Sequence, residues 1–128
     1  MPLLRGTTLR MRLVERKRPG VARTCRLFSQ FARGLGALHA AGLVHRDVQP
    51  SNLFVGSERV GRARGIVLDL GRTLHREHGS ASTGSHLAGV LPYLAPEQLL
   101  GGAVDARTDL VSLGLCLYET LTGTPARA

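Results

Sequence analysis

His45, Arg46 and Asp47 stand together in the segment LVHRDVQPSN (residues 43–52), and Asn52 follows five residues after the aspartate. These residue types, so closely spaced, have the composition of a phosphoryl-transfer site, where catalysis is mostly positioning and charge neutralisation. The neutral Gln49 stands where a cation facing a phosphate would be favourable. The segment therefore presents a reactive set that lacks one expected charge.

The elements around this segment give it a structural setting. NLFV (52–55) and IVLDL (66–70) are predicted strands, and the Gly- and Arg-rich stretch between them predicts a hairpin. Asp69-Leu70-Gly71 ends the second strand, and residues 76–86, rich in Ser and Gly, are a predicted mobile loop. Ala95-Pro96-Glu97 follows, with a proline suited to the first turn of a helix.

Three longer segments have helical patterns. Residues 8–20 predict a short amphipathic helix stopped at Pro19-Gly20. Apolar residues at spacings of three and four, from Leu27 to Leu38, predict one apolar helix face, and Gly42 suits the position just past its end. Residues 109–121 are apolar on nearly every side, which predicts a helix buried all round.

The three motifs, in this order, resemble the C-terminal lobe of a eukaryotic-type serine/threonine protein kinase, of the kind that bacteria also carry. The signature set of that family is H-R-D-L-x-x-x-N, then D-F-G, then A-P-E. The resemblance implies an α+β, mainly helical fold: a partial kinase C-lobe with one small β-hairpin. It also implies ATP and Mg²⁺ as cofactors and a protein substrate phosphorylated on Ser or Thr.

The resemblance assigns roles by residue. Asp47 would orient the substrate hydroxyl and accept its proton, Asn52 and Asp69 would hold Mg²⁺ against the nucleotide, and Arg46 would pair with a phosphate on the mobile loop. The other assigned residues are structural or regulatory: His45, Gly71 at the turn after the metal ligand, Glu97, Asp109 as a brace beneath the catalytic loop, and the candidate acceptors Ser80, Ser82, Thr83 and Ser85.

The sequence also departs from the family pattern. Gln49 replaces the catalytic-loop lysine and Val90 replaces a threonine that usually supports the catalytic aspartate. No G-x-G-x-x-G cradle occurs, and the single lysine, Lys17, is in a loop setting. Residues 1–128 are therefore interpreted as an incomplete kinase-like domain, from the hinge to the buried helix, without the N-lobe and the final C-lobe helices. Glu97 is expected to lack the arginine that pairs with it in the family.

Composition limits the remaining functions. The net charge is +8, carried almost wholly by arginines that are scattered without an evident basic helix face, and aromatic residues are only 4%. No nucleic-acid partner is therefore expected. Cys25 and Cys116 lie in apolar stretches and are predicted to be reduced and buried. No apolar run is long enough to span a membrane, and the expected location is cytoplasmic.

Three functions remain open. The first interpretation is that the chain is part of a protein serine/threonine kinase and is inactive alone. Its expected partner is then a separately encoded N-lobe. A non-catalytic, pseudokinase-like binding module is the second interpretation. A small-molecule phosphotransferase of the aminoglycoside type shares an H-x-D-x-x-x-x-N loop, but Arg46, the A-P-E motif and the helix beginning at Asp109 argue against it.

Overall fold

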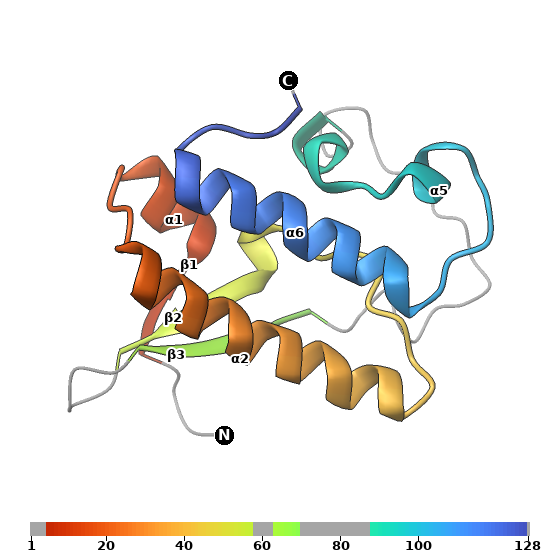
Figure 1. Ribbon diagram of the computed structural model, residues 1–128, viewed down its shortest axis with the longest axis horizontal. Coiled ribbons are helices and arrows are strands. Elements are labelled where there is room, and N and C mark those ends of the chain that lie inside the picture. The colour runs from red at the N-terminus through yellow and green to blue at the C-terminus, as the bar shows by residue number, and fades with distance from the viewer. Residues whose placement is uncertain (1–4, 58–62, 70–87, 128) are drawn as a thin grey trace.

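The computed structural model describes residues 5–57, 63–69 and 88–127, which form a mixed α+β fold that is mainly helical (Figure 1). The elements in chain order are β1 (Gly6–Thr8), α1 (Leu9–Val14), α2 (Val21–Ala40), η1 (Pro50–Asn52), β2 (Leu53–Gly56), β3 (Arg64–Val67), η2 (Leu91–Tyr93), α5 (Pro96–Leu99) and α6 (Ala106–Thr122). The elements η1 and η2 are single turns of 3₁₀ helix.

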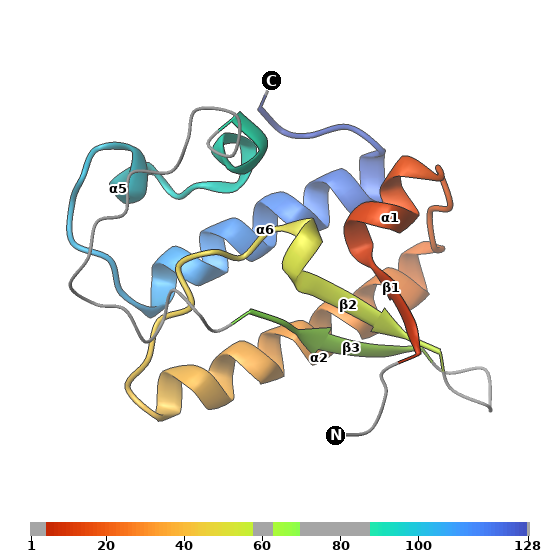
Figure 2. The same ribbon diagram turned by 180° about the vertical axis from the view of Figure 1, so that it is seen from behind.

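A three-stranded antiparallel sheet with the order β1-β2-β3 contains the predicted hairpin (Figure 2). The pairing of β2 with β3 is confirmed, with Val55 opposite Gly65. Strand β1 was not predicted, because three residues are too few to show an alternating pattern. Gly6 permits this third strand: its φ is 150°, and a Cβ there would lie 2.2 Å from the carbonyl oxygen of Val55.

Helix α1 is shorter than the predicted helix over residues 8–20. Thr8 is its N-cap, with a side chain that accepts from the Met11 amide at 3.2 Å. The helix ends at Val14 because Arg16 adopts a left-handed conformation (φ 56°) and the amides of residues 16 and 17 bond back to residues 13 and 12. This is the hydrogen-bond pattern of a Schellman motif, which closes the helix before Pro19 is reached.

Helix α2 confirms the predicted apolar face, with Leu27, Phe28, Phe31 and Leu35 buried. The rings of Phe28 and Phe31 meet edge to face, with centroids 5.2 Å apart. Gly42, with φ 79°, takes the predicted position just past the helix end. The ribbon shows α2 and α6 side by side, so this face packs between the sheet and α6 (Figure 1).

The sequence predicted that helix α6 is buried on every side, and the structure shows that it is not. Its buried face includes polar residues, namely Thr108, Asp109, Ser112, Glu119 and Thr120. Its other side exposes four large apolar side chains, Leu110, Val111, Tyr118 and Leu121. The prediction failed because it took apolar residues as the buried ones, whereas hydrogen bonds satisfy the polar residues of the inner face.

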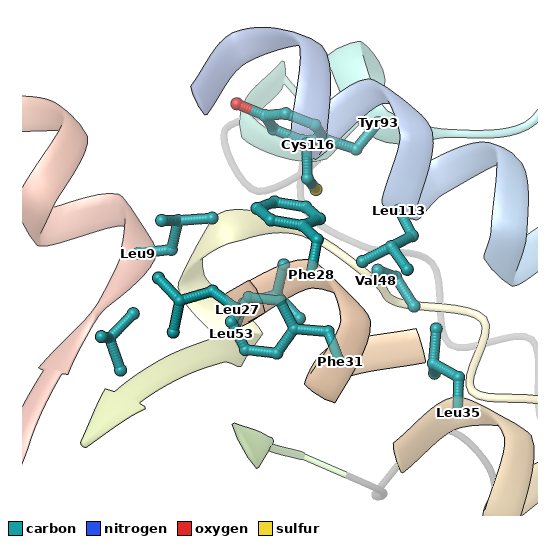
Figure 3. Close-up of a cluster of buried hydrophobic side chains, with 11 residues drawn as sticks. Leu9, Leu27, Phe28, Phe31, Leu35, Val48, Leu53, Tyr93, Leu113 and Cys116 are labelled. Carbon is teal, nitrogen blue, oxygen red and sulfur yellow. The ribbon is translucent and has the colours of Figure 1, made fainter. Parts of the chain in front are cut away.

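The core gathers side chains of α1, α2, β2, η2 and α6 (Figure 3). The ring of Phe28 lies beneath Cys116, which is fully buried, and that burial raises the pKa of the Cys116 thiol. Cys25, in contrast, is exposed, so only one of the two cysteines is buried as predicted. None of the helices in the described residues has the length and apolar character needed to cross a membrane.

Candidate active site

The loop between α2 and η1 is held from beneath by Asp109 of α6, which is 1% exposed. One carboxylate oxygen of Asp109 accepts from the His45 amide at 2.8 Å and the other from the Arg46 amide at 2.9 Å. The ring Nε2 of His39 lies 2.7 Å from the same carboxylate. Arg46 has a left-handed backbone (φ 70°), a strained conformation for a non-glycine residue that these bonds stabilise.

His45 joins the loop to the end of the hairpin. Its Nδ1 accepts from the Asp47 amide at 3.2 Å, and its Nε2 lies 2.8 Å from the carbonyl oxygen of Leu68. Both bonds are satisfied by the neutral tautomer with its proton on Nε2. The fully buried imidazole thus fixes the distance between the loop residue Asp47 and the strand end that carries Asp69.

The carboxylate of Asp47 is held by two side-chain amides. Gln49 donates to its Oδ1 at 2.8 Å and Asn52 donates to its Oδ2 at 3.1 Å. Asn52 also donates to the Asp47 carbonyl at 2.8 Å, so the turn of η1 and the loop form one unit. Both bonds of Asn52 use Nδ2, which leaves Oδ1 as the oxygen that a cation could bind.

Asp69 completes the site two residues after β3, which ends at Val67 and not at residue 70 as predicted. It is exposed, and its backbone is left-handed with φ 61°. Asp47, Gln49, Asn52 and Asp69 together line one open cavity of about 580 Å³. Val90, buried at 4% exposure, lines the same cavity. The structure thus brings Asp47 and Asn52 of the first motif, the aspartate of the second and Val90 to one cavity.

Arg10 of α1 and Tyr93 of η2 also line this cavity, and both interact with Glu119 of α6. Tyr93 of η2 donates to Glu119 of α6 at 2.5 Å, and Arg10 of α1 donates to the Tyr93 oxygen at 2.5 Å. Arg10 also pairs with Glu119 at 3.5 Å. Burial and the bond to Glu119 raise the pKa of Tyr93. The phenol therefore stays protonated and donates to Glu119 at any physiological pH.

Gln98, the residue after the third motif, contacts the loop. Its Nε2 donates to the Arg46 carbonyl at 2.9 Å, and its Oε1 accepts from the Ala95 amide at 3.0 Å. Glu97 has a partner other than the expected arginine: the hydroxyl of Thr108 donates to it at 2.6 Å. That hydrogen bond holds the pKa of Glu97 below its ordinary value of 4.5.

The lowered pKa of Glu97 predicts an acid-sensitive contribution to stability. The bond from Thr108 favours ionised Glu97 in the folded chain, so its contribution is present above pH 4.5 and is lost as the pH falls through the folded-state pKa. We expect the free energy of unfolding to fall more steeply below pH 4.5 in the wild type than in Thr108→Val. Urea unfolding at a series of pH values measures both slopes, and equal slopes would contradict the assignment.

Several contributors escaped the sequence analysis. His39 gave no signal, because its contact with Asp109 joins residues far apart in the chain. The Arg10–Tyr93–Glu119 interaction was missed for the same reason. Gln98 did carry a signal, since a Gln three residues after a helix N-cap is typical of a capping box.

Other predicted residues fall outside the part of the chain that the structure describes. These are Gly71 and the candidate acceptors Ser80, Ser82, Thr83 and Ser85. Arg46 is half-buried, and among the described residues its guanidinium forms no hydrogen bond or ion pair. Its expected pairing with a phosphorylated loop therefore stays a prediction.

The donor set fits a hard cation shared with a phosphate ligand. Among the described residues, no group of three or more His, Cys, Asp or Glu side chains could hold a metal alone. Mg²⁺ characteristically binds through one or two carboxylates together with substrate phosphates. Asn52 and Asp69, on the wall of one cavity, supply oxygen ligands of this kind.

Comparison with known proteins agrees with this geometry. The protein kinase domain matches the chain over residues 1–128. The chain belongs to the protein kinase domain family. It is 43% identical over 101 residues to serine/threonine-protein kinase pkn2 of Myxococcus xanthus, an alignment that covers 76% of this chain and 12% of that protein.

Two mycobacterial kinases are also similar to this chain. Serine/threonine-protein kinase PknL of Mycobacterium tuberculosis is 36% identical over 123 residues, which cover 96% of this kinase-family chain and 30% of PknL. PknB of the same species is 35% identical over 105 residues, covering 80% and 16% of the two chains. The chain therefore spans less than a third of the length of these relatives.

Proposed function

We propose that this chain is the C-terminal-lobe part of a protein serine/threonine kinase that uses ATP and Mg²⁺. The observation that carries the proposal is the Asp47 carboxylate, fixed by two amides in the cavity that Asp69 also lines. The relation to bacterial serine/threonine kinases supports a protein substrate and disfavours a small-molecule phosphotransferase.

Asp47 is the residue we assign to the proton. The substrate Ser or Thr hydroxyl attacks the γ-phosphorus of ATP, the bond from that phosphorus to the β,γ-bridging oxygen breaks, and ADP leaves. Asp47 orients the hydroxyl and accepts its proton. Asn52 and Asp69 would hold Mg²⁺, which neutralises the negative charge of the phosphates when it is bound.

The remaining kinase parts are proposed to come from further protein. Lys17, the only lysine, is exposed, pairs with Glu15 at 3.3 Å, and does not line the cavity. A phosphate-binding lysine and glycine-rich loop must therefore be supplied by an N-lobe, and the chain alone is expected to be inactive. The exposed apolar side chains of α6 support the proposal that additional helices cover this side of the helix. Because ATP is the proposed phosphate donor, a cytoplasmic location is part of the proposal.

A non-catalytic binding module is the second candidate, favoured by two residues at the site. Gln49 brings no charge to the cavity, and Val90 brings no hydroxyl. Compared with the lysine and the threonine of the family pattern, Gln49 and Val90 each give Asp47 weaker polar surroundings. The deciding question is whether the site transfers phosphate once the missing parts are present.

A chimaera tests the proposed function. The segment of PknL that aligns with this chain is replaced by residues 1–128, and the product is named the PknL chimaera. We expect transfer of radioactive phosphate from ATP to a generic protein substrate in the presence of Mg²⁺. A folded chimaera that binds ATP but transfers no phosphate would favour the non-catalytic module.

Gln49→Lys in the PknL chimaera is expected to raise turnover by a factor of about 10 to 10³. Gln49 donates a neutral hydrogen bond to Asp47 from the cavity wall, whereas a lysine adds a charge that can face the transferred phosphate. Initial rates at saturating ATP measure the change. Gln49→Ala is the control for the hydrogen bond alone, and equal rates in all three proteins would exclude a role for this position.

A further inference from the structure

Three arginines lie on one side of α2, away from the proposed active site. Arg23, Arg26 and Arg33 are all exposed, and with Gln30 they recur at spacings of three and four. Residues with this spacing share one helix face. The arginines are scattered in the sequence, and the expectation that they form no basic helix face was wrong. Helix α2 contains no acidic residue that could neutralise this face.

The arginines surround a cavity of about 710 Å³ beside the start of β3. Cys25, Gln30 and Ala63 also line it. The side chain of Gln30 donates to the Ala63 carbonyl at 3.2 Å and accepts from the Gly65 amide at 2.8 Å. These two hydrogen bonds connect β3 to α2 and hold in place the described segments that line the cavity.

A second, mostly apolar cavity of about 490 Å³ continues along α2 and β3. It begins at Gly34, next to Arg33, and its lining includes Leu38, Ile66 and Val67. Arg64, exposed, stands on its β3 side. The ribbon shows β3 running beside α2 in both views (Figures 1 and 2). We call the two cavities together the α2–β3 groove; it is basic at one end and apolar at the other.

We propose that the α2–β3 groove docks an extended protein segment that carries acidic residues followed by apolar ones. The arginines offer charge complementarity to carboxylates, and among the residues that the structure describes no acidic side chain lines either cavity. Seven helical residues separate Arg26 from Arg33, a rise of about 10 Å. An extended segment of polyproline II type advances about 3.1 Å per residue with three residues per turn, so acidic side chains about three residues apart share one face and match this distance.

A protein segment fits this groove better than a nucleic acid does. Among the described residues the basic end presents three arginines, fewer than the roughly six to ten phosphate contacts of a protein whose binding to duplex DNA depends strongly on salt. Within the described part of the chain, no aromatic side chain lines either cavity, and single strands depend on aromatic stacking. The apolar end, moreover, offers contacts to aliphatic side chains. Docking here is independent of the phosphoryl transfer proposed above, because the lining residues are not those of the active site.

Binding of a synthetic peptide to the full 128-residue chain tests the docking surface. The probe is a fluorescein-labelled peptide with glutamates about three residues apart, followed by leucine and valine, and anisotropy gives its dissociation constant. Reversal of two charges, in R26E/R33E, is expected to weaken binding on the order of 30-fold. Arg and Glu have similar helix propensities, and both positions are exposed, so α2 should remain folded; circular dichroism checks this.

Arg16→Glu is the matched control. Arg16 is exposed and lines neither cavity, so the change reverses a charge without touching the groove. Binding should change less than about twofold. Equal weakening by Arg16→Glu and by a single reversal, Arg26→Glu, would show general charge attraction and overturn the proposal. A peptide of the same charge without apolar residues, or a single-stranded nucleic acid, that binds as tightly as the probe would overturn it as well.

Cys25 gives a second readout that locates the peptide. It is exposed in the lining of the basic cavity, whereas Cys116 is buried with a raised thiol pKa and should not react. Saturating peptide is expected to slow alkylation of Cys25 at least about fivefold in the wild type and not in R26E/R33E. Binding without protection of Cys25 would place the peptide elsewhere and contradict docking in the groove.

Discussion

Asp47→Asn in the PknL chimaera is expected to lower phosphoryl transfer by a factor of about 10²–10⁴. The carboxylate of Asp47 is the group we assign to the substrate proton, and an amide cannot take up that proton. Asparagine also has one acceptor oxygen in place of two, whereas both Gln49 and Asn52 donate to the carboxylate. The amide must therefore turn away from one of these donors, and the geometry of the hydroxyl site changes as well.

The measurement is the initial rate of phosphate transfer at saturating ATP, together with the dissociation constant for ATP. The constant should change little, because the removed group acts on the hydroxyl rather than on the nucleotide. Glu15→Gln is the control, since Glu15 is exposed and its one ion pair among the described residues is with Lys17. A rate for Asp47→Asn within threefold of the unsubstituted chimaera would refute the role of Asp47 as proton acceptor.

The parts of the fold that follow from local pattern were predicted well. The apolar spacing of α2, the Gly42 end and the β2–β3 hairpin each need only a short stretch of sequence to be recognised. The end of α1 was missed, because a left-handed arginine at position 16 is not the residue type that signals a helix end. Strand β1 depends on Gly6 meeting Val55, a contact that no local pattern reports.

The candidate site divides in the same way. Asp47, Asn52 and Asp69 were found because their residue types and order form motifs, and the structure places them around one cavity. The contacts that hold them were harder to predict. His39 contacts Asp109 across 70 residues of sequence and Gln98 contacts Arg46 across 52. The partner of Glu97 depends on how α5 meets α6. Motifs report the reacting groups, whereas the supporting bonds follow from tertiary packing.

Asp109→Ala is expected to destabilise the chain by about 3–5 kcal/mol, the range for removal of one partner from a buried charged network. The Asp109 carboxylate is 1% exposed and accepts from the amides of His45 and Arg46. Without it, these two buried donors lose their acceptor, at a cost of about 1–3 kcal/mol each. The left-handed backbone of Arg46 also loses the bond that stabilises it.

Urea unfolding of the 128-residue chain measures this loss, and Ser112→Ala on the same buried face of α6 is the control. Within the described residues the Ser112 hydroxyl donates to the Thr108 carbonyl of its own helix and to no other group, so its removal should cost less than about 1 kcal/mol. His39→Leu separates the network from simple cavity formation. His39 contacts the Asp109 carboxylate at 2.7 Å, so its substitution should destabilise the wild type more than the Asp109→Ala protein. Additive effects of the two substitutions, or an Asp109→Ala loss no larger than that of Ser112→Ala, would mean that Asp109 does not brace the catalytic loop.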